Sequence, residues 1–185
     1  MEYTVRELNL IWLDCFDFMT YSKKTQMIKA YGIDRDIRKS LPKDMIPALQ
    51  DFLTLQELNK LNSCADDEFL QDVLKKYQDK NVVLVTIYST QYPALLRETD
   101  NPPYILYCKG NVDLLSMRCI AIVGTRRPSD YGRVVTKSYA KALAEAGLTI
   151  VSGLANGVDT IAHEEAISAG GKTIAVLAGG FDHIY

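Results

Sequence analysis

Two short loops carry most of the chemistry that this 185-residue chain offers, and each lies between an apolar run and a helix-like stretch. The first loop reads Gly-Thr-Arg-Arg at residues 124–127, and the second begins with Ser152 and Gly153. Glycine lets backbone N–H groups approach an anion, and the start of a helix adds partial positive charge. Arginine can hold a phosphate through two N–H groups at once. The pattern predicts a phosphate-binding crevice with contacts from Gly124, Thr125, Arg126, Arg127, Ser152 and Gly153.

Absent motifs narrow the kind of phosphate ligand. No Gly-x-Gly-x-x-Gly follows the first apolar run, and no Gly-x-x-x-x-Gly-Lys-Ser/Thr occurs in the chain, so we expect neither a dinucleotide nor another cofactor. A simpler interpretation is that Gly124 and Gly153 only make tight turns between strand and helix. Two such loops together, one with an arginine pair, favour the functional interpretation.

The elements that must position these loops alternate between strand and helix. The predicted strands are 119–123, 148–152 and 172–178, and the predicted helices between them are 129–146 and 157–169. Gly147 and the pair Gly170-Gly171 are suited to end the helices. This alternation predicts an α/β fold with a Rossmann-like parallel sheet and right-handed crossovers. Both loops would then lie at the carboxyl ends of strands, where such sheets bind ligands.

Residues 1–80 have apolar residues at helical spacing and predict a small all-helical domain. Capping boxes begin at Thr4 and Thr54, where Glu follows three residues later. Ser22 could cap a further helix that ends near Gly32, and Pro42 and Pro47 punctuate short pieces. Apolar residues at helical spacing predict a core rather than a groove for a partner.

From Asn81 the pattern changes to a β-type run, VVLVTIY, and residues 89–110 read as a loop and an edge strand that precede the main sheet. We therefore predict a helical domain over residues 1–80 and a Rossmann-like domain over residues 81–185. The chain stops one loop after its last predicted strand, so we expect the sheet to be incomplete and the native chain to continue.

Positive charge is local rather than global. The chain carries 21 Lys and Arg against 23 Asp and Glu, which gives a net charge of −2. Residues 118–141 hold six basic residues and one acidic residue, a net +5, whereas residues 1–80 hold 12 basic and 14 acidic residues. Arg133, Lys137 and Lys141 recur every four residues and so share one helical face. Arg133 is nearest to the first loop and is the candidate for a phosphate contact, while the simpler interpretation is a solvated basic face.

Acid–base chemistry has few candidates. Asp159 and His163 are four residues apart on a predicted helix, and Ser152 could serve as a nucleophile only if a base were aimed at it. Ser152 lacks the Gly-x-Ser-x-Gly setting, and a pair such as Asp159 and His163 more often holds a helix to a loop. We therefore predict no catalytic residue and no enzymatic activity. Phe181 could stack on an unpaired base or could pack in the core under its loop.

Other classes of site are not indicated. The four cysteines are scattered without a Cys-x-x-Cys pair, which predicts neither a zinc site nor disulfides and favours a reducing cytoplasm. Two histidines and no acidic cluster predict no metal centre. Charged residues interrupt any signal peptide, and no apolar run approaches the ~20 residues that span a bilayer, so we expect no membrane partner.

Three blocks, IVGTRRPSDYG, SGLANGVDTIAH and GGKTIAVLAGGFDHIY, resemble successive motifs of the DNA-processing protein A (Smf) family. The resemblance runs from about Tyr92-Pro93 to Tyr185 and is densest from Ile120 onward. The glycines, Arg126 and Asp159 fall in order at matching spacing. Asn156 stands where members often carry a basic or bulky residue, so we assign it no role.

The resemblance implies a bacterial protein of natural transformation. Such proteins bind incoming single-stranded DNA, protect it from nucleases and load a RecA-type recombinase onto it. Members dimerise through the Rossmann-like domain, so a homodimer is expected for the native-length protein. The helical region is often a sterile-alpha-motif-like bundle in this family.

A rival interpretation is a nucleotide phosphoribohydrolase of the lysine-decarboxylase-like group, whose loop-and-helix layout is similar. The diagnostic Pro-Gly-Gly-x-Gly-Thr-x-x-Glu motif of that group is absent, but it would fall beyond Tyr185. Gly-Thr-Arg-Arg followed by Ser-Gly-Leu-Ala favours the DNA-binding interpretation.

Overall fold

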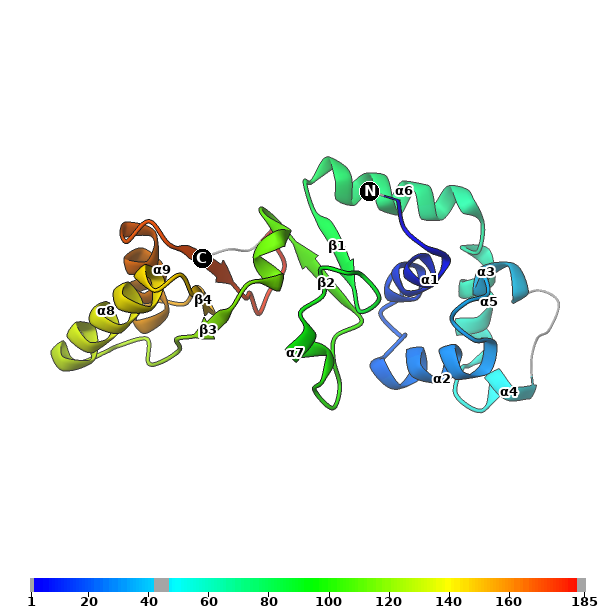
Figure 1. The fold of residues 1–185 in the computed structure, drawn as a ribbon. Coiled ribbons are helices and arrows are strands. Elements are labelled where there is room, and N and C mark those ends of the chain that lie inside the picture. The colour runs from blue at the N-terminus through cyan, green and yellow to red at the C-terminus, as the bar shows by residue number, and fades with distance from the viewer. Residues whose placement is uncertain (1, 42–46, 183–185) are drawn as a thin grey trace. The chain divides into compact units, whose positions relative to one another are not determined.

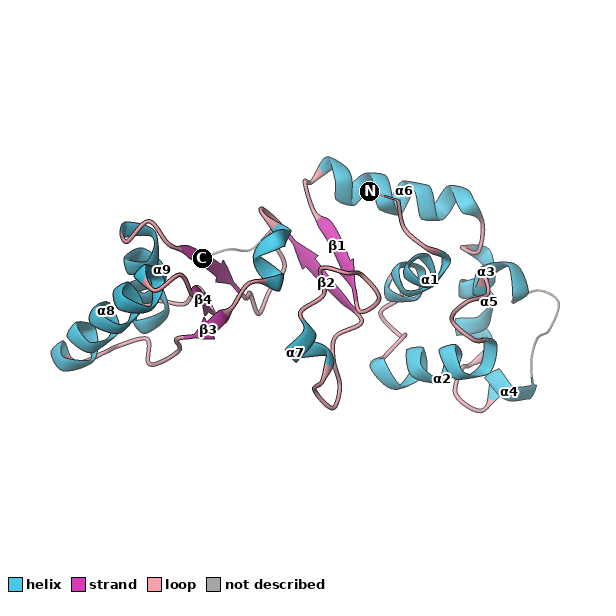
Figure 2. Cartoon of the chain, viewed as in Figure 1, coloured by secondary structure: helices cyan, strands magenta, loops and turns pink. Residues whose placement is uncertain are grey.

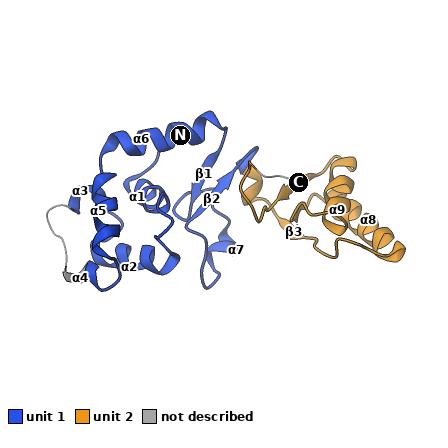
Figure 3. Ribbon diagram, turned by 180° about the vertical axis from the view of Figure 1, so that it is seen from behind, with its two compact units in different colours: residues 1–112 blue, residues 113–185 orange. Residues whose placement is uncertain are grey.

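The computed structural model describes residues 2–41 and 47–182 and divides into two compact units, Met1–Val112 and Asp113–Tyr185 (Figure 3). Pro42 and residues 183–185, which entered the sequence predictions, lie outside the described residues. Across residues 2–41 and 47–182, no helix has the length and apolar character needed to cross a membrane.

Unit 1 begins with a helical bundle, as predicted for its first 80 residues (Figure 2). Its helices are α1 (Val5–Asp14), α2 (Tyr21–Tyr31), α3 (Ile37–Ser40), α4 (Pro47–Gln50), α5 (Leu55–Ser63) and α6 (Asp67–Asp79). Both predicted capping boxes are confirmed at Thr4 and Thr54. The predicted cap at Ser22 is wrong: α2 starts at Tyr21, and the Thr20 hydroxyl accepts the Lys23 N–H at 3.3 Å. Ser22 lies inside the first turn, two positions after the residue that caps it.

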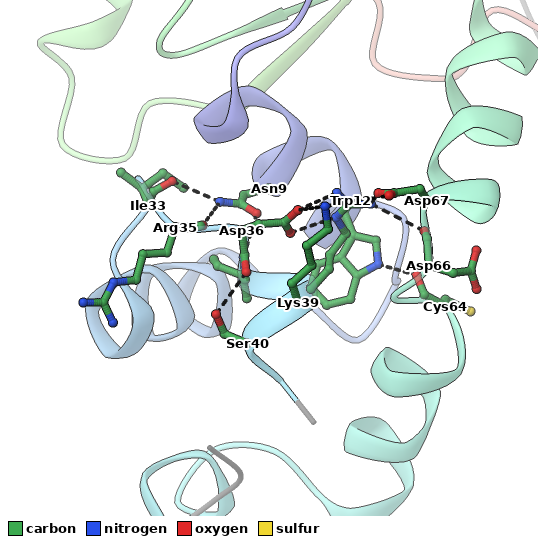
Figure 4. Close-up of polar contacts among 12 residues, drawn as sticks. Asn9, Trp12, Ile33, Arg35, Asp36, Lys39, Ser40, Cys64, Asp66 and Asp67 are labelled. Carbon is green, nitrogen blue, oxygen red and sulfur yellow. Dashed lines mark hydrogen bonds and ion pairs between the residues drawn. The ribbon is translucent and has the colours of Figure 1, made fainter. Parts of the chain in front are cut away.

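A buried polar network ties the bundle together (Figure 4). The Asn9 side chain on α1 donates to the carbonyls of Ile33 and Arg35 at 3.0 and 2.6 Å, and it accepts the Ile37 N–H at 3.1 Å. Trp12, one turn further on, is fully buried and donates through Nε1 to the Cys64 carbonyl at 2.7 Å. Because buried polar groups must find partners, these bonds fix α1 against two distant segments.

A β-hairpin completes unit 1. Strands β1 (Val83–Thr86) and β2 (Ile105–Cys108) pair antiparallel, with helix α7 (Ala94–Arg97) in their connection. The Glu7 carboxylate on α1 accepts the Ser89 hydroxyl at 2.7 Å, which joins the hairpin to the helices. The change from a helical to a β-type sequence pattern at residue 81 thus does not coincide with the division between the compact units, which falls after Val112.

Unit 2 is the predicted parallel α/β arrangement. After a 3-10 helix, η1 (Val112–Ser116), which begins at the unit boundary, it contains β3 (Cys119–Ala121), α8 (Asp130–Glu145), β4 (Thr149–Ser152), α9 (Val158–Ser168) and β5 (Lys172–Ala175). The strands are parallel in the order β3-β4-β5, which confirms the α/β fold class (Figure 1). Both helices end just before their predicted glycines.

The core of unit 2 lies between its sheet and its two helices. Ile150 on β4 is fully buried against four alanines, two from α8 and two from α9, namely Ala140, Ala144, Ala162 and Ala166. Small side chains let the two helices approach each other and the strand closely. Both helices therefore cover the face of the sheet to which Ile150 points.

Two strands end earlier than the apolar runs predict. β3 stops at Ala121 and β5 at Ala175, although Ile122 and Val176 each donate one further bond to β4, at 3.0 and 2.8 Å. Both β3 and β5 pair with β4, so neither can extend beyond the end of β4 at Ser152. Two residues later, Leu154 adopts a φ of 60°, which is not a strand conformation. The surplus apolar residue Val123 is 70% exposed beyond the end of the sheet.

Candidate functional site

The first predicted loop lies at the carboxyl end of β3, where Gly124, Thr125, Arg126 and Arg127 are all exposed. The Thr125 hydroxyl accepts the Arg127 N–H at 3.2 Å, which folds the loop into a turn. Pro128 is buried, and the Ser129 hydroxyl then caps α8 by accepting the Gly132 N–H at 3.2 Å. The loop is thus held at its far end and open to solvent in its middle.

The loop rests on the start of α9 through backbone contacts. The Val158 N–H donates to the Thr125 carbonyl at 3.2 Å. A Cβ on Gly157 would lie 2.4 Å from the Thr125 carbonyl oxygen and 2.7 Å from the Arg126 carbonyl carbon, and Gly157 has a φ of 91°. Only glycine fits this approach and this conformation. Gly157 was not predicted as a site residue, although it is the first residue of the predicted helix 157–169; in the structure it caps α9, which begins at Val158.

The second predicted loop uses its polar groups inside the protein. Ser152 is 2% exposed, and its hydroxyl donates to the Ile122 carbonyl at 2.6 Å. The Gly153 N–H donates to the Asp159 carboxylate at 3.1 Å. Both groups that were predicted to face a phosphate are therefore engaged. These bonds hold the ends of β3 and β4 and the first turn of α9 together.

His163 is buried one turn after Asp159 and faces β5. Its Nδ1 lies 2.6 Å from the Thr173 hydroxyl, which itself donates to the Ile150 carbonyl at 2.8 Å. Thr173 must then accept, so Nδ1 carries the proton. The buried Nε2 has no hydrogen-bond partner within the described part of the chain. Burial lowers the pKa of His163, and the nearby Asp159 carboxylate opposes this shift. His163 is therefore neutral near pH 7.

The basic residues around the loop divide into two groups. In the part of the chain that the structure describes, none of the ion pairs involves Arg126, Arg127 or Arg133, and all three side chains are exposed. Lys137, by contrast, lies 3.5 Å from Glu165 on α9, and Lys141 lies 3.9 Å from Glu145. The unpaired arginines are therefore at the loop and the first turn of α8, where Asp130 is the acidic residue.

Two aromatic residues lie in the segments that follow β3 and β5. Phe181 is half-buried in the turn after β5. Tyr131, which the sequence analysis did not single out, stands in the first turn of α8 with 78% of its surface exposed. The signal that could have found Tyr131 was its place four residues after Arg127.

This exposed loop can offer hydroxyl, guanidinium and backbone donors to an anion. Among residues 2–41 and 47–182, no three histidine, cysteine or carboxylate side chains gather as a metal ion would require. Fold and loop together define an α/β protein with an exposed, arginine-bearing loop at its strand ends.

Comparison with known proteins places the chain in one family. The model of the family described as DNA recombination-mediator protein A matches residues 83–185, and the chain belongs to this family. It is 45% identical over 117 residues to the DNA processing protein DprA of Bacillus subtilis, and 40% identical over 120 residues to that of Streptococcus pneumoniae. The alignments cover 63% and 65% of this chain.

A solved structure is similar over the whole chain. The X-ray structure of DNA processing protein A from Streptococcus pneumoniae covers 100% of this chain with a TM-score of 0.63 and 27% sequence identity. The aligned part is 61% of that structure, and it is 39% and 40% of the two DprA sequences. The chain therefore corresponds to less than two thirds of each of these relatives.

Proposed function

We propose that this chain binds the phosphate backbone of single-stranded DNA through the loop 124–127 and the start of α8. Three exposed arginines that have no ion-pair partner among residues 2–41 and 47–182 are the observation that carries the proposal. Membership of the recombination-mediator family supports DNA as the anion. Phosphate contacts position a nucleic acid without specifying its sequence, so sequence preference should be weak.

Each residue of the predicted site has a distinct role in this proposal. Arg126 makes the main charge-assisted contact, Arg127 and Arg133 flank it, and Gly124 and Thr125 offer backbone and hydroxyl donors. Ser152 and Gly153 have a structural role beside the loop 124–127, because their own donors are engaged by Ile122 and Asp159. A base contact by Phe181 remains a prediction.

At the level of the whole protein, we propose a role in natural transformation. The protein would protect incoming single-stranded DNA and load a RecA-type recombinase onto it, as a homodimer in the native-length form. The names of the relatives, which are DNA processing proteins, support this role. We place the activity in the cytoplasm because all four cysteines are free thiols.

We propose that the action is binding rather than catalysis. Ser152, the one candidate nucleophile, is buried and donates its proton to a backbone carbonyl, while Asp159 and His163 bond to Gly153 and Thr173. This set lacks the hydrogen bond between nucleophile and base that activates a serine nucleophile in acyl-transfer sites.

The experiment compares Arg126→Ala with Lys141→Ala in equilibrium binding of a single-stranded oligonucleotide across a salt titration. Loss of a charge-assisted bond costs ~1.5–3 kcal/mol, and loss of one phosphate contact lowers the salt slope by about 0.7 on single strands. We expect both effects for Arg126→Ala. Lys141→Ala is the matched control, because Lys141 already pairs with Glu145.

Equal losses for the two variants would contradict a local site and leave only a diffuse basic face. The same titration with duplex DNA tests strand selectivity. Wild-type protein should bind the single strand more tightly, and equal affinity for the duplex at every salt concentration would contradict the proposal.

A further inference from the structure

The two most exposed aromatic side chains in the described part of the chain are both on α8. Tyr131 is 78% exposed and Tyr139 is 64% exposed. Both rings are therefore largely outside the core, which takes Ala140 and Ala144 from this helix. An aromatic ring left in solvent beside unpaired cationic groups is the composition of surfaces that bind single-stranded nucleic acid.

Of these two rings, Tyr131 lies nearer in the chain to the unpaired arginines, with Asp130 as the acidic residue of the same turn. It follows Arg127 by four residues and precedes Arg133 by two, and neither arginine has an ion-pair partner among the described residues. Five residue steps separate it from Arg126, so the two Cα atoms are at most ~18 Å apart. Tyr139 lies two helical turns, or ~12 Å, further along α8, where Lys137 and Lys141 are already paired with glutamates.

The first turn of α8 gives Tyr131 a defined backbone position. The Ser129 hydroxyl accepts the Gly132 N–H, and the buried Pro128 anchors the turn that precedes it. A side chain on a capped helix start presents its ring with less loss of conformational freedom than one on an open loop.

We propose that the Tyr131 ring stacks on an unpaired base next to the phosphate held by Arg126 and Arg127. This inference rests on the proposed function and adds what phosphate contacts lack, a reason to prefer a single strand. In a duplex both faces of each base are covered by its neighbours, whereas a single strand can turn a base onto the ring. Every base has a π-face, so the contact tolerates any sequence.

The test uses two oligonucleotides of equal length and charge: oligothymidylate and an abasic strand with the same sugar-phosphate backbone. Wild-type protein should bind oligothymidylate more tightly than the abasic strand. Tyr131→Ala should weaken oligothymidylate binding about 5- to 150-fold, which corresponds to ~1–3 kcal/mol for one stacked base. Its affinity for the abasic strand should stay unchanged.

Two further variants make the result specific. Tyr131→Phe keeps the ring and should keep the preference for oligothymidylate, and Tyr139→Ala, the matched exposed tyrosine, should bind both strands like wild type. A Tyr131→Ala protein that binds both strands as wild type does, or that loses affinity equally for both, overturns the stacking. So does loss of the preference in Tyr131→Phe, since that would assign the contact to the hydroxyl.

Arg126→Ala separates this inference from the proposed function. It should weaken binding to both strands by the same factor, because the phosphates are common to them. If Arg126→Ala weakens binding to both strands equally while Tyr131→Ala changes the affinity for the two strands by the same factor or not at all, the phosphate site is supported and the stacking is contradicted. If wild-type protein binds neither strand, both proposals fall.

Discussion

The Val158 N–H donates to the Thr125 carbonyl at 3.2 Å, and this bond attaches the arginine loop to the first turn of α9. The loop and the helix come together only because Gly157 has no side chain at the point of closest approach. The backbone contact thus sets the position of Arg126 and Arg127 without using either side chain. It leaves both guanidinium groups available to a ligand.

Gly157→Ala should therefore damage both stability and DNA binding. The new Cβ would meet the Thr125 carbonyl oxygen at 2.4 Å, and alanine is strained at a φ of 91°. We expect a loss of ~1–3 kcal/mol from the backbone strain alone, measured as a lower urea midpoint. Gly132→Ala is the control, since its Cβ would meet Pro128 and Ser129 at an ordinary 3.5 Å. Equal behaviour of the two variants would contradict the close approach.

Asp159→Ala should loosen the second loop. The Gly153 N–H would lose its charged acceptor, and a hydrogen bond to a charged group contributes ~1.5–3 kcal/mol. Hydrogen exchange should speed up at Gly153, where the amide is now bonded at 3.1 Å. Asp159→Asn keeps a carbonyl oxygen at the same place and should show a smaller change. Unaltered exchange in Asp159→Ala would mean that this bond does not hold the loop in solution.

The buried His163 should make the stability of the protein depend on pH. Burial lowers its folded-state pKa below 6.5, the value that applies when it is unfolded. Above about pH 6.5 the ring is neutral in both states, so the full stability is present. As the pH falls from there toward the folded pKa, the unfolded state binds more protons and stability is lost.

Urea unfolding at about pH 7.5 and about pH 5.5 measures this effect. Wild-type protein should lose more stability between the two values than His163→Gln, which cannot titrate. The same loss in both proteins would assign the pH dependence to other groups.

Nucleotide turnover should be absent. Incubation with nucleoside mono- and triphosphates should yield no free base and no phosphate, because the Ser152 hydroxyl is held by Ile122 and His163 by Thr173. Product analysis by chromatography measures this directly. Hydrolysis that disappears in Asp159→Ala or His163→Ala would favour a phosphoribohydrolase instead.

The local features of the fold could be predicted from the sequence. The capping boxes at Thr4 and Thr54, the helix ends before Gly147 and Gly170, and the parallel alternation of strand and helix were all predicted and are confirmed. Each depends on residues within a few positions of one another, because caps and periodicity are local properties of the backbone. The misplaced cap at Ser22 shows the limit, an error of two residues.

The placement of the hairpin depended on distant residues. Strands β1 and β2 pair with each other, and Glu7 reaches Ser89 across 82 positions of the chain. No local sequence pattern around Ser89 predicts that its partner is the carboxylate of Glu7. The sequence shows that a strand begins after Asn81 but does not show with which unit it packs.

The sequence by itself determined the family motifs, the α/β alternation and the presence of an arginine loop after a strand, because these follow from residue type and spacing. Only the tertiary structure decided which donors remain available. Ser152 and Gly153 have the composition of an anion loop, yet their hydrogen bonds are accepted by a carbonyl 30 residues away and a carboxylate six residues away. The Arg126 side chain stays available to a ligand because Gly157, which has no side chain, approaches only the backbone of the loop. A hydrogen bond is made by whichever partner the fold brings within about 3 Å, and residue type alone does not specify that partner.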